Sequence, residues 1–516
     1  MRRELTKYLR LPTMSRMEIG AVLSRRPAVV GGLLLILMLL TGLGWAVSSP
    51  VESSPDDNYH LGSIWCPRPA GESCQTSVVD GDPVVRVPIA VADESMRCYV
   101  LQSNKSAGCA LGYNDSHMVW SKRFDNGAYP IGYYHFHHLL VGKDVQTSVL
   151  VMRGVNVLIA VTLLGTIGFC APRQLRRPFI GAIVASWVPM GVYFIASNNP
   201  SSWAVSGLMA YSAATFMAPQ QNGRRRIALV ICAVIGAVMC LTSRYDAAFF
   251  LLVVGLALLF AVPWKRGGWI GLSALAGVAL LGFGTFMASS QVSKVAYFLR
   301  VFEASDPAKS ADKQSFFEKL LVGLETAPKY LGGFWGHTWT PGWHDVPLGA
   351  RAPYVLTIMA AGAFVAVGLR RGGWRKWTAL AIIVGSMVLL PALFYANGAM
   401  DTIELYQARY IFPLLAPTFF LMLAVDQDEG AWFTVPQAVW VTVFISLCQT
   451  ITLHTLLLRF VQGAQERWEL DLNKHIEWWW SAPVSPMMVW FLTTCLATAA
   501  LGTSMAMLTR TAEKHA

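Results

Sequence analysis

Charged side chains are scarce in this sequence: Asp, Glu, Lys and Arg make up 14% of its 516 residues, whereas hydrophobic residues make up 54%. In a soluble globular protein about a quarter of the residues are charged. So few charges are too few to keep the surface of a soluble protein of this length in water. The composition therefore excludes a soluble enzyme and predicts an all-α polytopic membrane protein.

Apolar runs close to the bilayer-spanning length of about 20 residues predict about twelve transmembrane helices. We place them near 28–48, 149–170, 178–196, 202–219, 227–243, 246–263, 269–289, 352–369, 377–395, 408–425, 433–457 and 486–508. The chain then divides into a basic N-terminus (1–27), a first helix (28–48), a loop domain (49–148), helices two to seven (149–289), a second long loop (290–351), helices eight to twelve (352–508) and a tail (509–516).

Basic residues occur in every second short loop, and Lys and Arg in such loops stay in the cytoplasm. Those between helices are Arg173, Arg176, Arg177, Arg224, Arg225, Arg226, Lys265, Arg266, Arg370, Arg371, Arg375 and Lys376. Both termini are therefore predicted to be cytoplasmic and both long loops extracytoplasmic. The net charge of +11 follows from this topology, so it gives no reason to expect a nucleic-acid partner. The first helix has a longer apolar run than a signal peptide, so we interpret it as an uncleaved anchor.

Closely spaced cysteine pairs are absent, because no Cys-x-x-Cys occurs in the chain. Four cysteines instead lie in the first long loop, at Cys66, Cys74, Cys98 and Cys109. In an oxidising compartment four such residues predict two disulfides, and three connectivities are open to them. We expect nearest neighbours to pair, Cys66 with Cys74 and Cys98 with Cys109. A zinc site is the alternative.

The rest of the first loop suggests a small scaffold that returns to the membrane. Short β-branched runs around Asp80-Gly81 predict a hairpin. The end of the loop is aromatic and amphipathic, as expected of a segment along the membrane surface. Three histidines there, His135, His137 and His138, suit a metal site, but they also suit the polar tips of an interfacial segment.

The second long loop begins amphipathic, at Val292–Leu299 and Phe316–Leu324, and then becomes rich in glycine and tryptophan from Gly332 to Trp343. Aromatic rings between glycines can stack on the apolar faces of sugars. They also form the aromatic belt at membrane interfaces, which is the commoner case.

An adjacent pair of acids, Asp56 and Asp57, follows the first helix, with His60 close behind. A carboxylate beside lipid loses hydration, so its presence there suggests a function. The alternative is structural, since Ser or Asp beside a proline is a common helix N-cap.

Two arginines lie at the outer ends of predicted helices. Arg244 is followed by Asp246, which suggests either a local ion pair or a functional site. Arg409 lies in Gln407-Ala408-Arg409-Tyr410, and a guanidinium at this depth suits an anionic partner such as a phosphate. The alternative for Arg409 is an arginine that reaches the lipid headgroups.

These motifs resemble a known family. Pro55-Asp56-Asp57-Asn58-Tyr59-His60 is similar to the Pro-x-Asp-Glu-x-x-His region of the bacterial integral-membrane family called domain of unknown function 2142. Gln407-Ala408-Arg409-Tyr410 with Pro413 resembles its late Gln-x-Arg-Tyr motif, and the likeness spans about 30–510. The second acid is Asp57 where the family more often has Glu, so which acid acts stays open.

That family in turn resembles the GT-C superfamily of polytopic glycosyltransferases, which use polyprenyl-phosphate sugars at the extracytoplasmic face and carry an essential acid in the first external loop. The resemblance implies a bacterial plasma-membrane enzyme with a polyprenyl-phosphate sugar donor and a glycan or protein acceptor. Asp56 or Asp57 would be the general base, with His60, Arg244, Asp246, Gln407, Arg409 and Tyr410 as substrate-binding residues. A divalent metal between the two acids and His60 is an option that no spacing demands.

Two other classes of protein stay open. A lipid or polysaccharide transporter, or flippase, would have a similar number of helices, but it should show an internal repeat with interrupted helices, and we find none. A non-catalytic envelope assembly protein would need neither the acid pair nor the arginine.

Overall fold

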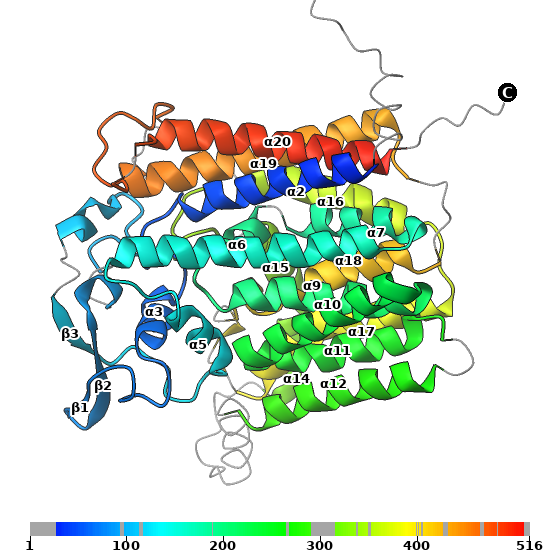
Figure 1. Cartoon of the computed structure of the whole chain (residues 1–516), viewed down its shortest axis with the longest axis horizontal. Helices are drawn as coiled ribbons and strands as arrows, with labels where there is room; N and C mark the ends of the chain where they lie inside the picture. The colour runs from blue at the N-terminus through cyan, green and yellow to red at the C-terminus, as the bar shows by residue number, and fades with distance from the viewer. Residues whose placement is uncertain are drawn as a thin grey trace, which may run out of the picture.

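The fold is described from a computed structural model of the chain (Figure 1). The structure describes residues 27–509 except 93–96, 113–116, 188, 265–267, 290–314, 337–338, 349–351, 399, 401, 404–405, 427–431, 465–468 and 482. Several sequence expectations lie outside the described residues: the basic N-terminus up to residue 26, Lys265 and Arg266, the stretch Val292–Leu299, and the tail after residue 509.

The chain forms a bundle of roughly parallel and antiparallel helices, with a small domain at one end (Figure 1). The bundle helices are α2 (Pro27–Ala46), α6 (Val145–Cys170), α7 (Arg173–Ser186), α8 (Met190–Ile195), α9 (Ser201–Met217), α10 (Gly223–Ser243), α11 (Tyr245–Ala261), α12 (Trp269–Met287), α16 (Ala352–Gly368), α17 (Trp374–Ala396), α18 (Leu415–Ala424), α19 (Val435–Val461) and α20 (Pro486–Leu508). We call the end with the small domain the loop-domain end. The opposite end, where α2 begins and α20 ends, is the terminus end.

Within the described ranges, seven helices are long and apolar enough to cross a membrane: α2, α6, α10, α12, α17, α19 and α20. Three further apolar helices, α11, α16 and α18, are shorter. The chain is therefore a multi-pass, mainly helical membrane protein, and a total of twelve spans stays a prediction.

Helices differ in how much of their surface is buried. Nearly every residue of α9 is buried, whereas α12 buries only Leu275, Ala279 and Gly282. A helix that is apolar on all sides and buried lies inside the bundle, and one that exposes its apolar side chains suits contact with lipid. α9 approaches α10 closely at Gly207 and Gly236, where a Cβ on either residue would lie within 3.0 Å of the other's carbonyl oxygen.

Two of the expected helices are interrupted in the structure. The span predicted at 178–196 is split into α7 and α8, with Pro189 directly before α8. The span predicted to begin at 408 starts with two 3-10 turns, η7 (Ala408–Tyr410) and η8 (Phe412–Leu414), before α18. Proline lacks a backbone N–H and cannot continue a regular helix, so Pro413 explains the second interruption. Both interruptions contact the start of the first long loop: Tyr193 of α8 donates to the carbonyl of Ser53, and Arg409 of η7 donates to that of Pro55.

The small domain comes mainly from the first long loop. It contains α3 (Asp57–Trp65), α5 (Gly132–His138) and an antiparallel sheet of β1 (Thr76–Val79), β2 (Asp82–Pro88) and β3 (Met118–Ser121), in the order β1-β2-β3. The predicted hairpin is β1–β2, which turns at Asp80-Gly81 where both residues have positive φ. The third strand was not expected. The disulfides are Cys66–Cys74 and Cys98–Cys109, the expected nearest-neighbour pairs.

The described part of the second long loop is helical at first, with α14 (Phe316–Glu325), α15 (Ala327–Gly332) and the 3-10 turn η5 (Gly333–Trp335). Ser315 and Glu318 form a capping box at the start of α14. Phe334 and Trp339 are buried, so these two aromatic side chains pack within the protein and offer no face to a sugar or to a membrane interface.

Candidate functional site

Asp56 occupies the N-cap position directly before α3, but its carboxylate does not cap the helix. Asp57 is the first residue of α3, and its carboxylate accepts hydrogen bonds from the backbone N–H and the hydroxyl of Ser54, which precedes the helix. Asp56 itself has φ 63°, ψ 15°, a left-handed conformation that is costly for a residue with a Cβ. The N-cap position therefore belongs to Asp56, but without a side-chain cap, and the carboxylate of Asp56 is left for another partner.

That partner is Arg409, whose guanidinium forms an ion pair with Asp56 across more than 350 residues of sequence. A second Arg409 nitrogen donates to the carbonyl of Pro55 at 3.1 Å, and Asn199 donates to the same carbonyl at 2.9 Å. These two donors hold the peptide that precedes Asp56 and so support its left-handed conformation. Arg123 lies 3.8 Å from the other Asp56 oxygen. The Asp56 side chain is 34% exposed, so water or a ligand can reach it.

Arg244 is a second guanidinium beside this pair. Its side chain is bound by Asp246 through two hydrogen bonds, at 2.8 and 2.6 Å, so the predicted local ion pair is present. The Arg244 guanidinium also lies over the ring of Tyr410 at 5.6 Å, and Arg409 lies over the same ring at 5.1 Å. Tyr410 therefore joins the two arginines through cation–π contacts.

Tyr129 and His60 complete a ring of side chains. Arg244 lies 5.7 Å from the Tyr129 ring centre, and Tyr129 packs edge-on against His60 at 5.1 Å. His60 is fully buried, and its Nδ1 is 3.0 Å from the hydroxyl of Tyr134. Its Nε2 has no hydrogen-bond partner among the described residues. We call Asp56, Arg409, Tyr410, Arg244, Tyr129 and His60 the arginine ring.

The two acids have opposite electrostatic environments. Burial is the largest single influence on the pKa of Asp56 and would raise it, but the charges around the carboxylate, that of Arg409 first, together with the Arg409 hydrogen bond outweigh burial and lower that pKa below its ordinary value. Asp56 is therefore a carboxylate at neutral pH. Burial raises the pKa of Asp57 in spite of the opposing charge of Arg153. Burial also lowers the pKa of His60 to about 3, so its imidazole is neutral.

Arg153 on α6 explains why Asp57 is inaccessible. The guanidinium donates to the carbonyls of Ala46, Ser49 and Pro50 at 3.1, 2.6 and 2.7 Å. It lies 3.9 Å from Asp57, and the side chains of Arg153 and Asp57 are 1% and 0% exposed. Arg153 thus fixes the chain that leaves α2, and Asp57 supplies the counter-charge.

A short segment of the second long loop, Gly342–Asp345, crosses the chain next to the arginine ring. We call it the strap. The N–H of Gly342 donates to the Tyr193 hydroxyl at 3.0 Å, and the Trp343 indole donates to the carbonyl of Glu52 at 2.8 Å. His344 Nε2 lies 3.2 Å from Oε1 of Gln407. The strap therefore connects the segment that carries Asp56 to the turn that carries Arg409.

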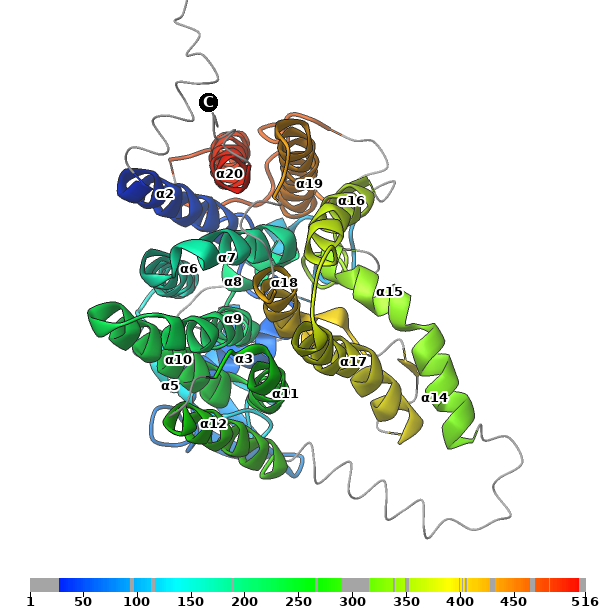
Figure 2. The ribbon, with the colours of Figure 1, turned by 90° about the vertical axis from the view of Figure 1, so that its right-hand side faces the viewer.

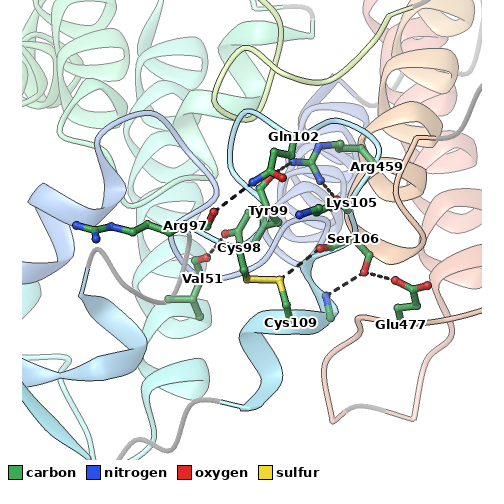
Figure 3. Close-up of a disulfide and its surroundings, with 11 residues drawn as sticks. Val51, Arg97, Cys98, Tyr99, Gln102, Lys105, Ser106, Cys109, Arg459 and Glu477 are labelled. Carbon is green, nitrogen blue, oxygen red and sulfur yellow. Dashed lines mark hydrogen bonds between the residues drawn. A yellow bond between two sulfur atoms is a disulfide. The ribbon is translucent and has the colours of Figure 1, made fainter.

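The last strap residue, Asp345, is held by Arg459 of α19 at 2.6 Å. The same guanidinium donates to the carbonyls of Tyr99 and Lys105, which lie within the loop closed by the Cys98–Cys109 disulfide (Figure 3). Arg459 is fully buried, so this contact ties both long loops to the bundle from inside. Gln407 is likewise a partner of the strap, and in the structure it does not contact Asp56.

The acid pair does not have the geometry of a shared metal site. The described residues contain no group of three or more His, Cys, Asp or Glu side chains that could hold a metal ion. Asp56 faces Arg409 and Asp57 faces Ser54 and Arg153, so the two carboxylates have separate partners. The option of a metal between both acids and His60 does not fit this arrangement.

The three histidines of the first loop have ordinary hydrogen-bond partners. His135 contacts the carbonyl of Arg68, and His138 contacts that of Ile64. His137 is buried between the carbonyl of Tyr133 and the side chain of Asn156. The three rings thus connect α5 to Arg68, to α3 and to α6, and they form no metal-binding group among the described residues.

Sequence reasoning missed several residues of this region: Arg123, Tyr129, Arg153, His344 and Arg459. A lone arginine in an apolar run is a recognisable signal, because its burial in a membrane is costly, and it could have identified Arg153 and Arg459. Arg123, Tyr129 and His344 lie in loops whose path no local pattern predicts.

No curated protein and no solved structure matches the chain. One family model does, over residues 39–418, a range that contains the two acids, both site arginines and the strap. Because this range is well over half of the sequence, the chain belongs to the family described as Predicted membrane protein (DUF2142).

Proposed function

We propose that this protein is a glycosyltransferase that moves a sugar from a polyprenyl-phosphate donor to an acceptor hydroxyl on a cell-envelope glycan or protein. The observation that carries the proposal is the ion pair between Asp56 and Arg409, with Arg244 joined to it through Tyr410. A carboxylate that accepts a proton and guanidinium groups that bind a phosphate are the two components that such a transfer requires. The resemblance to the GT-C superfamily supports the same reaction.

The proposed site faces the extracytoplasmic side of a bacterial plasma membrane, with both termini in the cytoplasm. Two features support this orientation. The loop domain has two disulfides, which persist in oxidising compartments. Arg173, Arg176 and Arg225 lie at the terminus end, as the distribution of basic residues in bacterial membrane proteins requires of a cytoplasmic face.

In the proposed reaction Asp56 accepts the proton of the acceptor hydroxyl. The acceptor oxygen forms a bond to the anomeric carbon as the bond from that carbon to the phosphate oxygen breaks. The bonding electron pair leaves with the lipid phosphate, which Arg409 and Arg244 stabilise. Asp57 is a poor candidate for the base, because it is fully buried and held by Ser54 and Arg153.

Arg409 has to turn from Asp56 toward the phosphate when a donor binds, because its guanidinium is paired with Asp56 in this structure. This exchange would release the carboxylate for the acceptor at the moment that the leaving group is neutralised. Tyr129 and Tyr410, which are half-buried, would supply aromatic walls beside the donor, and the neutral, fully buried imidazole of His60 would support the Tyr129 ring from behind.

The test is substitution in cells that depend on the native gene, with Asp56→Asn and Arg409→Ala as the site variants. Asp82→Asn is the matched control, since Asp82 is an exposed acid on the same loop. With normal amounts of protein in the membrane, both site variants should lose an envelope glycan and accumulate its lipid-linked donor on the outer face, while the control behaves as wild type. Unchanged glycans in both site variants would contradict transfer, and donor retained on the cytoplasmic face would indicate a flippase.

A further inference from the structure

A groove lies in the other half of the bundle, far from the arginine ring. It occupies about 910 Å³, open part included, between α2, α6, α7 and α20. It is lined by the first half of α2, the last half of α6 and the last turns of α20, all of which lie toward the terminus end. Viewed from that end, these four helices form one group (Figure 2).

The groove has one charged end and otherwise apolar walls. Arg176, in the first turn of α7, is its one charged lining residue, and Trp187 lines it at the other end of the same helix. The helical rise separates these two residues by about 16 Å. Apart from Ser504, the remaining lining residues are glycines and apolar side chains such as Leu34, Leu164 and Ile183. A groove of this kind suits a lipid: the charged end suits a headgroup, and the apolar walls suit one acyl chain.

The charge at the mouth of the groove is positive. Arg176 is half-buried and donates to the carbonyls of Phe169 and Ala171 at the end of α6. Among the described residues, the charges that act on Arg176 come mainly from Arg225 and Arg173, with a smaller opposite effect of Cys170, and none comes from a carboxylate. Three neighbouring arginines favour an anionic group.

We propose that this groove is a binding site for an anionic phospholipid of the leaflet at the terminus end. The phosphate is bound by Arg176, with Arg173 and Arg225 nearby, and one acyl chain lies between α2, α6 and α7. This inference does not depend on the proposed enzymatic reaction, because the groove and the arginine ring lie at opposite ends of the bundle.

The experiment measures lipid retention by the full-length protein in native mass spectrometry, with phosphatidylglycerol or phosphatidylcholine as the added lipid. Gly168→Leu fills the groove: a Cβ there meets Phe179 at an ordinary 3.6 Å, so the longer side chain is accommodated at the expense of the lipid. Arg176→Gln removes the charge, and Arg176→Lys restores it. The matched control is Gly32→Leu, because Gly32 does not line the groove and has nothing within 4 Å of a Cβ.

The wild type and the Gly32→Leu control should each retain one phosphatidylglycerol, in preference to phosphatidylcholine. Gly168→Leu should abolish this retention. Arg176→Gln should reduce it about fivefold, as expected for the loss of one basic residue near an anionic headgroup, and Arg176→Lys should recover most of it. Equal retention of the two lipids by the wild type, or undiminished retention in Gly168→Leu, would overturn the proposal.

Discussion

Asp56 and Asp57 are adjacent in the chain and each lies beside a buried arginine, yet their surroundings differ in almost every respect. Asp57 and Arg153 are both closed off from solvent, and backbone carbonyls occupy most of the Arg153 donors. Asp56 is 34% exposed, and its arginine contacts an aromatic ring and only one backbone carbonyl. The two neighbouring acids therefore have different roles. Asp57 fixes the chain, and Asp56 remains available to a ligand.

The backbone explains how two neighbours reach different partners. The left-handed conformation of Asp56 reverses the chain before α3 begins, so the Asp56 side chain meets η7 while Asp57 stays against α6. Such strain persists only where the surroundings hold it, and here Arg409 and Asn199 hold the carbonyl of Pro55. The arrangement that exposes one acid therefore depends on the arginine paired with it.

The largest effect should come from breaking the pair of Asp57 and Arg153, which is closed off from solvent and which we call the closed pair. Arg153→Met leaves Asp57 buried without its counter-charge and three carbonyls without a donor, so it should cost about 3–5 kcal/mol and sharply reduce folded protein. The double variant Arg153→Met/Asp57→Asn should recover part of this loss, because it removes the unpaired charge. Thermal unfolding followed by size-exclusion chromatography measures both. If the Arg153→Met protein is stable, the closed pair does not hold the fold together.

Variants of the second pair, Asp56 and Arg409, which we call the open pair, should lose transfer activity and change little in stability. Arg409→Lys keeps the charge but loses the paired hydrogen bonds to Asp56 and Pro55, so transfer should fall about 100-fold or more. Asp56→Asn should be as inactive, and because the amide can still accept a hydrogen bond from Arg409 and Asp56 is 34% exposed, its unfolding free energy should change by less than that of Arg153→Met. Both expectations are checked by measuring the transfer rate and the melting temperature of each variant in the same preparation. If Asp56→Asn unfolds the protein and Asp57→Asn does not, the two roles are reversed.

The strap extends the comparison to a second closed arginine, Arg459. Replacing Cys98 and Cys109 by serine frees the loop that supplies the Tyr99 and Lys105 carbonyls to Arg459, at a cost of about 2–4 kcal/mol. Limited proteolysis should then cut this loop faster. The control is the Cys66→Ser/Cys74→Ser pair, which should leave the 98–109 loop protected. Equal protection in both variants would show that Arg459 alone holds the loop.

The most gradual effect is that of pH on the buried His60. Its pKa is lowered from an ordinary 6.5 to about 3 by burial, so between these values the unfolded chain binds a proton that the folded chain does not. Stability should be complete above pH 6.5 and should fall by about 1.4 kcal/mol per pH unit below it. The His60→Asn variant should show a shallower slope of melting temperature against pH than His135→Asn, which changes an exposed histidine. Identical slopes would mean that His60 protonates in the folded protein.

The sequence predicted the features that depend on local pattern. Apolar runs located the helices, Asp80-Gly81 located the hairpin, and the short spacing of Cys98 and Cys109 favoured their pairing. The sequence singled out Asp56 and Arg409 as candidate site residues, but it did not predict the ion pair that joins them. The roles of the two acids could not be separated, because an octapeptide cannot indicate which carboxylate meets α6 and which meets η7. That choice depends on the left-handed conformation of Asp56, which has no local signature, and on Arg153, which is recognisable as a lone arginine in an apolar run but whose partners no local pattern predicts.

In the proposed function, Asp56 and Arg409 form the site at which a lipid phosphate is bound and released. The direct test is a cryo-electron microscopy structure of the protein in lipid nanodiscs with polyprenyl phosphate, the leaving group of the proposed reaction. We predict density for the phosphate within hydrogen-bond distance of the Arg409 or Arg244 guanidinium, with Asp56 released from Arg409 and Asp57 unmoved beside Arg153. Phosphate density away from both arginines, with the pair of Asp56 and Arg409 intact, would contradict the claim.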